Sequence, residues 1–231
     1  INDVDQNRMI AAAAQFNVGT ANLEDIKIGE VDTIILATPP KVVVETLQSL
    51  GKTLRDGQLV ISMAAAVPIQ RIRSVLPKNI PVARILPNPP SLLGKGMNPV
   101  AFEADTQQSV KDFTFELLGV MGHTIEVQDD LMAWCVGLSG AALRTILPVL
   151  EGLTLAGMEA GLSQKEARRV AAANLAGVAA LALETDLSLE QIHDLTPMQT
   201  LDEKAVSNLF LETARNTQQK VEATQKMLMG S

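Results

Sequence analysis

The sequence has little of the chemistry on which several classes of protein depend. Cys135 is the only cysteine, so no disulfide can form within the chain, and this composition suits the reducing cytoplasm. The two histidines, His123 and His193, are far apart, and no two His or Cys residues share a metal-binding motif. We therefore expect a cytoplasmic protein without a metal site.

Positive charge is also scarce. The chain carries 19 Lys and Arg against 26 Asp and Glu, and no basic cluster interrupts this balance. Because nucleic-acid binding depends on cations that contact phosphates, we expect no nucleic-acid partner. No uninterrupted apolar stretch reaches the roughly 18 residues of a bilayer span, and the first residues lack the pattern of a signal peptide, so we expect no membrane partner either.

The first half of the chain alternates apolar strands with helices, which indicates a parallel sheet with right-handed crossovers. The clearest strand patterns, rich in β-branched residues, lie at 31–38, 58–63 and 82–86, and weaker ones lie at 99–102 and 123–127. Helical patterns lie at 5–16, 41–50, 69–76 and 107–118.

The second half, after a boundary near residue 128, shows helical patterns only. These patterns lie at 131–161, 164–183, in a short segment from 188, and at 201–228. Apolar side chains surround the first of these segments, which indicates a helix buried on every side. The other helices of a single chain can hardly bury this helix on every side by themselves. We therefore expect a homodimer or higher oligomer that forms through residues 131–228.

Ligands of an open parallel sheet bind beyond the carboxyl ends of its strands. Residues Ala37, Thr38 and Pro39 follow the first predicted strand. Ala64 and Ala65 follow the second, and their small side chains would let a flat ring approach the backbone.

Pro87 and Asn88 follow the third predicted strand. The side chain of Asn88 offers a donor and an acceptor at once, as recognition of a carboxamide requires. A second interpretation stays open, in which the prolines only end the strands and Asn88 caps a turn.

These strand-end segments resemble the signatures of the pyrroline-5-carboxylate reductase family. The resemblance continues at 94–97, at 130–132 and at 138–140, and covers nearly the whole chain in order and spacing. It implies an α/β fold. A Rossmann-type dinucleotide-binding domain, with its N-terminal part incomplete, would occupy residues 1–128, and an all-helical substrate and dimerisation domain would occupy 129–231.

The resemblance also implies an activity. Hydride would pass from NADH or NADPH to the C=N carbon of a small cyclic imino acid, which gives proline. Ala64, Ala65, Pro87 and Asn88 would lie near the cofactor. The Ser139-Gly140 pair would lie near the substrate, where backbone donors at a helix start suit an anion.

The glycine-rich phosphate loop of such a domain is absent from this sequence, whose candidate glycines, Gly19 and Gly29, stand alone. By the resemblance, Ile1 falls at the end of the second strand of the fold. About one strand–helix unit would then be missing, and we expect the sequence to be part of a longer chain. Asn2 and Asp3 would contact the ribose of the cofactor, where an acid favours NAD over NADP; a solvated terminal Asp is the alternative.

The substrate side departs from the family. The Ser-Gly-Ser-Gly-Pro stretch reads Ser-Gly-Ala-Ala-Leu at 139–143, and the threonine-rich loop is reduced to 196–200, where Thr196 and Thr200 still offer hydroxyls. Arg144 could bind a substrate carboxylate in place of the lost donors, or form an ion pair at the dimer contact. His193 could protonate a substrate nitrogen, or be a surface residue. A reductase for a different imine or carbonyl acid, and a catalytically inactive dimeric paralogue, are therefore alternatives.

Overall fold

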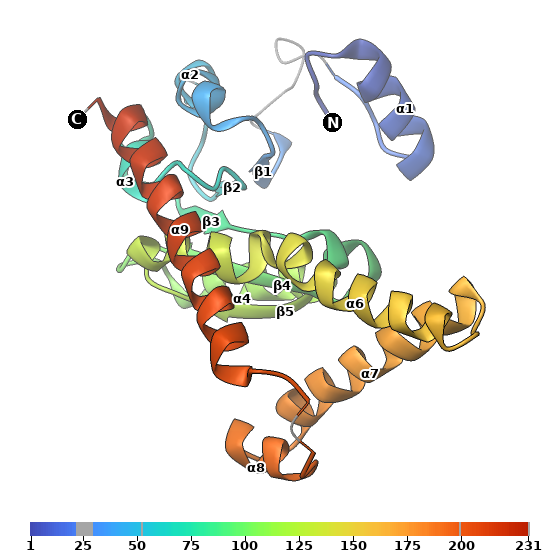
Figure 1. Cartoon of the computed structure of the whole chain (residues 1–231). Coiled ribbons are helices and arrows are strands. Elements are labelled where there is room, and N and C mark those ends of the chain that lie inside the picture. Colours follow the sequence, from blue (N-terminus) through green and yellow to red (C-terminus); the bar gives the residue numbers. More distant parts are fainter. Residues whose placement is uncertain (22–29, 52, 199, 231) are drawn as a thin grey trace.

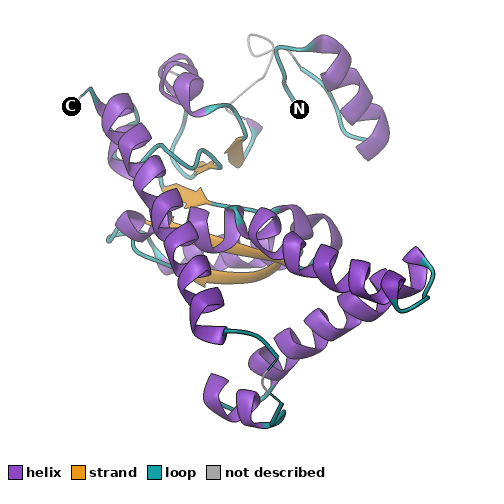
Figure 2. Cartoon of the chain, in the orientation of Figure 1, coloured by secondary structure: helices purple, strands orange, loops and turns teal. Residues whose placement is uncertain are grey.

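The computed structural model describes residues 1–21, 30–51, 53–198 and 200–230. Gly29, one of the two isolated glycines, and Gln199 of the threonine-containing loop lie outside the described residues. A five-stranded sheet with helices forms one part of the molecule, and long helices form the rest (Figures 1 and 2).

The strands of the sheet lie side by side in the order in which they occur in the chain. They are β1 (Thr33–Leu36), β2 (Leu59–Ser62), β3 (Val82–Ile85), β4 (Gly96–Phe102) and β5 (Gly122–Glu126). The helices of this half are α1 (Gln6–Phe16), α2 (Pro40–Leu50), α3 (Ile69–Arg73) and α4 (Gln108–Gly119). Each overlaps a segment for which the sequence predicts the same type of element, so the predicted alternation of strands and helices is confirmed.

The sheet is mainly parallel, as expected, and contains one antiparallel pair of strands. Strands β1, β2 and β3 pair in parallel, but β4 pairs antiparallel with β3, with Arg84 opposite Ala101. Only the short 3₁₀ segment η2 (Pro89–Leu93) lies between these two strands. A parallel crossover needs a dozen or more residues, so this short connection returns the chain in the opposite direction. Strand β5 then pairs in parallel with β4.

Each face of the sheet has its own apolar core. On one face, Val60 and Val82 pack with Leu47 of α2 and Ile72 of α3. On the other face, strand residues such as Ile61 pack with Leu118 of α4. Because both faces are covered, every residue of β2 and β3 is buried, as the continuous apolar runs predict.

All described elements after β5 are helical, as expected. They are η3 (Asp129–Leu131), α5 (Met132–Cys135), the π-helical turn η4 (Val136–Gly140), α6 (Ala142–Glu159), α7 (Gln164–Glu184), α8 (Leu189–Asp194) and α9 (Glu203–Met229). Figure 1 shows α6 and α7 extending away from the sheet, whereas α9 runs back across it. The segment expected as one helix over 131–161 is divided at η4. There Gly137 lies so close to Ala214 of α9 that a Cβ atom would come within 2.7 Å of the Ala214 carbonyl oxygen.

Helix α6 has no buried residue in the single chain. Large apolar side chains are exposed along it, at Leu143, Ile146, Leu147, Val149, Leu153, Leu155 and Met158. By length and composition alone, the segment 129–159 could cross a membrane, because an 18-residue window within it has a mean hydropathy of 1.5. One such helix is weak evidence for a membrane span. An exposed apolar surface of this kind equally suits contact with a second protein subunit.

Candidate cofactor and substrate site

The carboxyl ends of β1, β2 and β3 bring the three predicted strand-end segments to one edge of the sheet. Residues 37–39 follow β1, residues 64–65 follow β2, and residues 87–88 follow β3. A hydrogen bond of 2.9 Å, from the Met63 N–H to the Leu36 carbonyl, connects the end of β2 directly to the end of β1. The structure therefore gathers seven of the predicted cofactor residues, from Ala37 to Asn88, at the edge where α/β proteins bind ligands.

The turn after β2 is compact and presents small side chains. The Ala64 N–H donates to the Ser62 hydroxyl at 3.3 Å, and the Val67 N–H donates to the Ala64 carbonyl at 3.1 Å. Ala64 is buried and Ala65 is half-buried. A flat ring can approach such a turn because neither alanine has a side chain beyond Cβ.

The end of β1 combines an unsatisfied hydroxyl with a helix start. The Oγ1 atom of Thr38 is buried and has no hydrogen-bond partner among the described residues. Pro39 precedes α2, and its side chain cannot cap the first N–H groups of that helix. Polar ligand atoms that reach this edge would meet both a free hydroxyl and the positive end of a helix.

Asn88 joins the strand ends to the helical half of the chain. Its Oδ1 atom accepts from the Met97 N–H at 3.1 Å, and its Nδ2 atom donates to the Ser139 carbonyl at 3.3 Å. An amide side chain has two N–H donors and two acceptor lone pairs, so one donor and one lone pair remain available. Asn88, a predicted cofactor residue, is thus in direct contact with Ser139, a predicted substrate residue.

Ser139 and Gly140 lie in the π-helical turn η4. The Ser139 side chain is buried, and its hydroxyl donates to the Cys135 carbonyl at 2.8 Å, so it stabilises this turn. A Cβ atom at Gly140 would meet only the Val136 side chain, at 3.7 Å. Turns of this kind interrupt α-helices and often occur at functional sites. Nearby, burial raises the pKa of the Cys135 thiol, and the charge of Arg84 opposes that shift.

The structure does not bring Asn2 and Asp3 into contact with the strand ends. Asn2 donates to the Ala21 carbonyl at 2.9 Å, and the Asp3 carboxylate lies 3.3 Å from the Arg8 guanidinium. Among the residues that the structure describes, no hydrogen bond links either side chain to residues 37–39. Both lie beside α1, which packs apart from the sheet in Figure 1.

The three further substrate candidates lie on the helical half of the chain. Arg144 is exposed on the first turn of α6 and makes no ion pair with any described residue. Thr196 and Thr200 are exposed in the connection between α8 and α9. Figure 1 shows this connection at the opposite end of the molecule from α2 and β1.

His193 lies on α8 and is exposed. Its Nδ1 atom is 3.3 Å from Asp194 Oδ1, and its Nε2 atom is 2.9 Å from Glu203 Oε2. The hydrogen bonds to Asp194 and then to Glu203 raise the pKa of His193. These contacts link the end of α8 to the start of α9, and the role of His193 as a proton donor stays a prediction.

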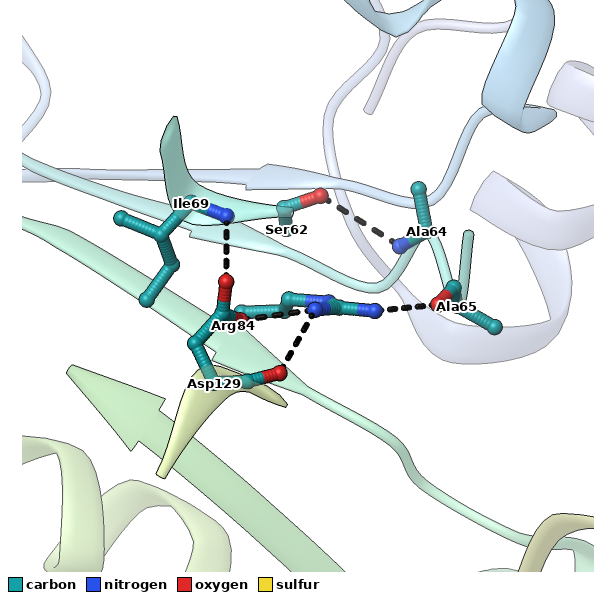
Figure 3. Close-up of polar contacts among 6 residues, drawn as sticks. All are labelled: Ser62, Ala64, Ala65, Ile69, Arg84 and Asp129. Atoms are coloured by element: carbon teal, nitrogen blue, oxygen red, sulfur yellow. Dashed lines mark hydrogen bonds and ion pairs between the residues drawn. The ribbon is translucent and has the colours of Figure 1, made fainter. Parts of the chain in front are cut away.

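Arg84 and Asp129 form an ion pair that the sequence patterns do not single out (Figure 3). Arg84 is fully buried on β3, and its Nη1 atom lies 2.7 Å from Asp129 Oδ1. The guanidinium also donates to the Ala65 carbonyl, while Asp129 accepts from the Ile69 N–H at 2.9 Å. One signal was present in the sequence, namely a single charge inside the apolar run at 82–86.

The fold and the strand-end site together define a Rossmann-type oxidoreductase fold followed by a helical dimerisation region. The family "NADP oxidoreductase coenzyme F420-dependent" matches residues 1–66, and the family "Pyrroline-5-carboxylate reductase dimerisation" matches residues 129–224. The chain belongs to the pyrroline-5-carboxylate reductase family.

Two relatives illustrate the similarity. Pyrroline-5-carboxylate reductase 1 of Bacillus subtilis is 28% identical over 187 residues, which cover 81% of this chain and 63% of the relative. Pyrroline-5-carboxylate reductase of Corynebacterium melassecola is 32% identical over 163 residues, which cover 68% of this chain and 59% of the relative. The chain therefore spans less than two thirds of the length of either relative.

Solved structures share the fold at low sequence identity. The Coxiella burnetii pyrroline-5-carboxylate reductase superposes with a TM-score of 0.80 at 22% identity, over 96% of this chain and 86% of that one. The Plasmodium falciparum pyrroline carboxylate reductase, solved with NADP bound, gives a TM-score of 0.76 at 17% identity, over 86% and 79% of the two chains.

Proposed function

We propose that this chain forms most of an NAD(P)H-dependent reductase that converts pyrroline-5-carboxylate to proline. The observation that carries the proposal is the Asn88–Ser139 hydrogen bond of 3.3 Å. It joins the strand-end segment proposed to hold the nicotinamide to the turn proposed to hold the substrate. Hydride transfer needs the two reactants in contact, and this hydrogen bond brings the residues of both sides together.

The described residues at the strand ends fit a nicotinamide cofactor. The small residues Ala64 and Ala65 leave room for a flat ring, Asn88 keeps a donor and an acceptor for its carboxamide, and Thr38 offers a hydroxyl without a partner among the described residues. When bound, such a cofactor supplies the hydride. The residues of this chain bind it, orient it and exclude water around it.

The substrate would bind with its carboxylate near the start of α6. No side chain caps the first turn of this helix, so its N–H groups suit an anion. Arg144, in the same turn, adds a guanidinium whose fork of donors matches a carboxylate. A cyclic imine can arrive already protonated, so the reaction does not require a general acid from the protein.

We further propose that the chain divides near residue 128 and that the residues after it associate with a second copy. The exposed apolar side chains of α6 support this association, as does the match to the dimerisation family. Because Thr196 and Thr200 lie far from the strand ends of their own chain, they would act at the strand ends of a partner. The reaction would take place in the cytoplasm.

Of the two nicotinamide cofactors, we propose that NAD is preferred. A carboxylate such as that of Asp3 accepts hydrogen bonds from free ribose hydroxyls and repels a 2′-phosphate. Arg8 lies 3.3 Å from Asp3 and partly neutralises it, so the preference should be moderate. An Asp3→Ser variant should lower the ratio of kcat/KM for NADH to kcat/KM for NADPH by about tenfold. An unchanged ratio would remove Asp3 from the cofactor site.

The experiment is to follow oxidation of NADH and NADPH by the purified protein with pyrroline-5-carboxylate, and to detect proline as the product. A six-membered cyclic imino acid and a 2-oxo acid serve as comparison substrates. Turnover that favours pyrroline-5-carboxylate supports the proposal. Preference for a comparison substrate would make the protein a reductase for a different imine or carbonyl acid, and the absence of nucleotide binding would make it an inactive dimeric paralogue.

A further inference from the structure

The buried guanidinium of Arg84 connects two parts of the chain that are far apart in sequence. Arg84 lies in the central strand β3 and is 0% exposed. Its Nη2 atom donates to the carbonyl of Ala65 in the turn after β2, and its Nη1 atom donates to Asp129 Oδ1 at 2.7 Å. The first contact is within the sheet half, and the second is to the first residue of the helical half (Figure 3).

Asp129 in turn holds the start of helix α3. Pro68, which precedes this helix, has no side-chain group that could cap it. The cap comes instead from Asp129, whose Oδ2 atom accepts from the Ile69 N–H at 2.9 Å across 60 residues of sequence. One carboxylate therefore binds both the guanidinium of Arg84 and the backbone of α3.

These contacts fix the turn at 63–68 from both sides. Ala65, in the middle of the turn, is held by Arg84, and Ile69, directly after it, is held by Asp129. The same pair anchors the beginning of the helical half, which continues through α5 to Ser139 in the π-helical turn. One partly buried ion pair thus contacts both the turn and the start of the helical half.

We propose that Arg84 and Asp129 are a positioning pair that holds the turn at 63–68 at the correct distance from the helical half, so that nicotinamide and substrate meet in a reactive geometry. This inference rests on the proposed function. Neither residue touches the reacting atoms, and they act through the backbone of Ala65 and Ile69. Displacements of about 1 Å can lower the rate of a reaction by about a hundredfold, so such a pair affects kcat more than KM.

The pair depends on the chemistry of both side chains. Arg84 donates to Asp129 from Nη1 and to the Ala65 carbonyl from Nη2, whereas a lysine has a single nitrogen that cannot occupy both positions. Asp129 must accept from a cation and an N–H with separate oxygens, and a neutral amide has only one acceptor oxygen. Arg84→Lys and Asp129→Asn therefore each lose one contact while they keep the size of the side chain nearly unchanged.

A second ion pair in the sheet half of the chain provides the matched control. Arg73 of α3 contacts Glu103, which follows β4 at the opposite edge of the sheet from the strand ends. The side chains of Glu103 and Asp129 are equally exposed, at 25%. Glu103→Gln therefore makes the same chemical change as Asp129→Asn, but at the end of α3 rather than at its start.

The test measures four quantities for each variant: thermal stability, amide hydrogen exchange at Ile69, and kcat and KM with pyrroline-5-carboxylate. We expect Asp129→Asn and Arg84→Lys to speed exchange at Ile69 about tenfold or more and to lower kcat by about tenfold or more, with KM changed by less than about threefold. Glu103→Gln should lower stability to a similar extent but leave exchange at Ile69 and kcat close to the wild-type values.

Two results would overturn the inference. One is unchanged exchange at Ile69 in Asp129→Asn, a conservative variant at a partly exposed position that should fold even if Arg84→Lys does not. The other is an equal loss of kcat in Glu103→Gln, which would mean that general destabilisation explains the effect. A wild-type protein without turnover would instead refute the proposed function, while the exchange measurement would still decide whether the pair holds the turn.

Discussion

Replacing Ile146 with glutamate should dissociate the proposed dimer. Ile146, Val149 and Leu153 are spaced by three and four residues, so they lie on one face of α6, and all three are exposed in the single chain. Ile146 exposes 51% of its surface. If a second subunit covers this face, the substitution places a carboxylate inside an apolar contact.

The expected magnitude follows from the exposed fraction. Complete burial of an isoleucine side chain stabilises by about 1.5–3 kcal/mol, so covering the exposed half contributes about 1 kcal/mol. In a two-fold symmetric dimer the residue occurs twice, which makes about 2 kcal/mol. At 1.4 kcal/mol for each factor of ten, loss of this term alone raises the dissociation constant about 30-fold. Burial of two carboxylates adds several kcal/mol more.

Light scattering after size exclusion, at a series of protein concentrations, measures this change. Val120→Glu is the matched control, because Val120 is 77% exposed and follows α4 in the sheet half. We expect Ile146→Glu to be monomeric where the wild type and Val120→Glu are dimeric. A monomeric wild type, or an Ile146→Glu protein that dimerises as strongly as the wild type, would refute the assignment of this face to self-association.

Three further predictions concern single residues. The hydrogen bonds of Asp194 and Glu203 raise the pKa of His193 above its ordinary value near 6.5. The protonated His193 therefore stabilises the folded protein below about pH 6.5, and this stabilisation is lost as the pH rises through the raised pKa. An NMR titration should show a lower pKa of His193 in Glu203→Gln than in the wild type. An unchanged pKa would exclude the contact in solution. Gly137→Ala should lower the free energy of unfolding by about 1–3 kcal/mol, because the new Cβ atom meets the backbone of α9, and a denaturant melt equal to that of the wild type would contradict this packing. Cys135 is buried and its pKa is raised, so a thiol reagent should modify it only after unfolding; rapid reaction of the native protein at neutral pH would show that the site is open.

The elements that the sequence predicts best are those whose pattern is local. Strands β1, β2 and β3 are continuous apolar runs bounded by turn-forming residues, so their type and position are visible without any partner. Strand β4 begins earlier than the pattern at 99–102 suggests. Its first residues are held by contacts outside the strand, since Asn98 donates to the His123 carbonyl and accepts from the Ser91 hydroxyl.

The candidate site shows the same division between local and distant information. Asn88 and Ala65 could be proposed because strand ends are recognisable. The partner of Arg84 could not be predicted, because Asp129 lies 45 residues away in the sequence. The sequence does not show which carboxylate the folded chain brings to Arg84. The π-helical turn at 136–140 was also missed, because the close packing of Gly137 on α9 joins segments that only the fold brings together.

The most direct measurement is a crystal structure of the protein with a reduced nicotinamide cofactor and proline. We predict that the nicotinamide ring lies against the backbone of Ala65, with its carboxamide bonded to the Asn88 side chain, and that proline lies beside the turn that contains Ser139. Density for the nicotinamide at any other edge of the sheet, or for proline at a distance from this turn, would contradict the account.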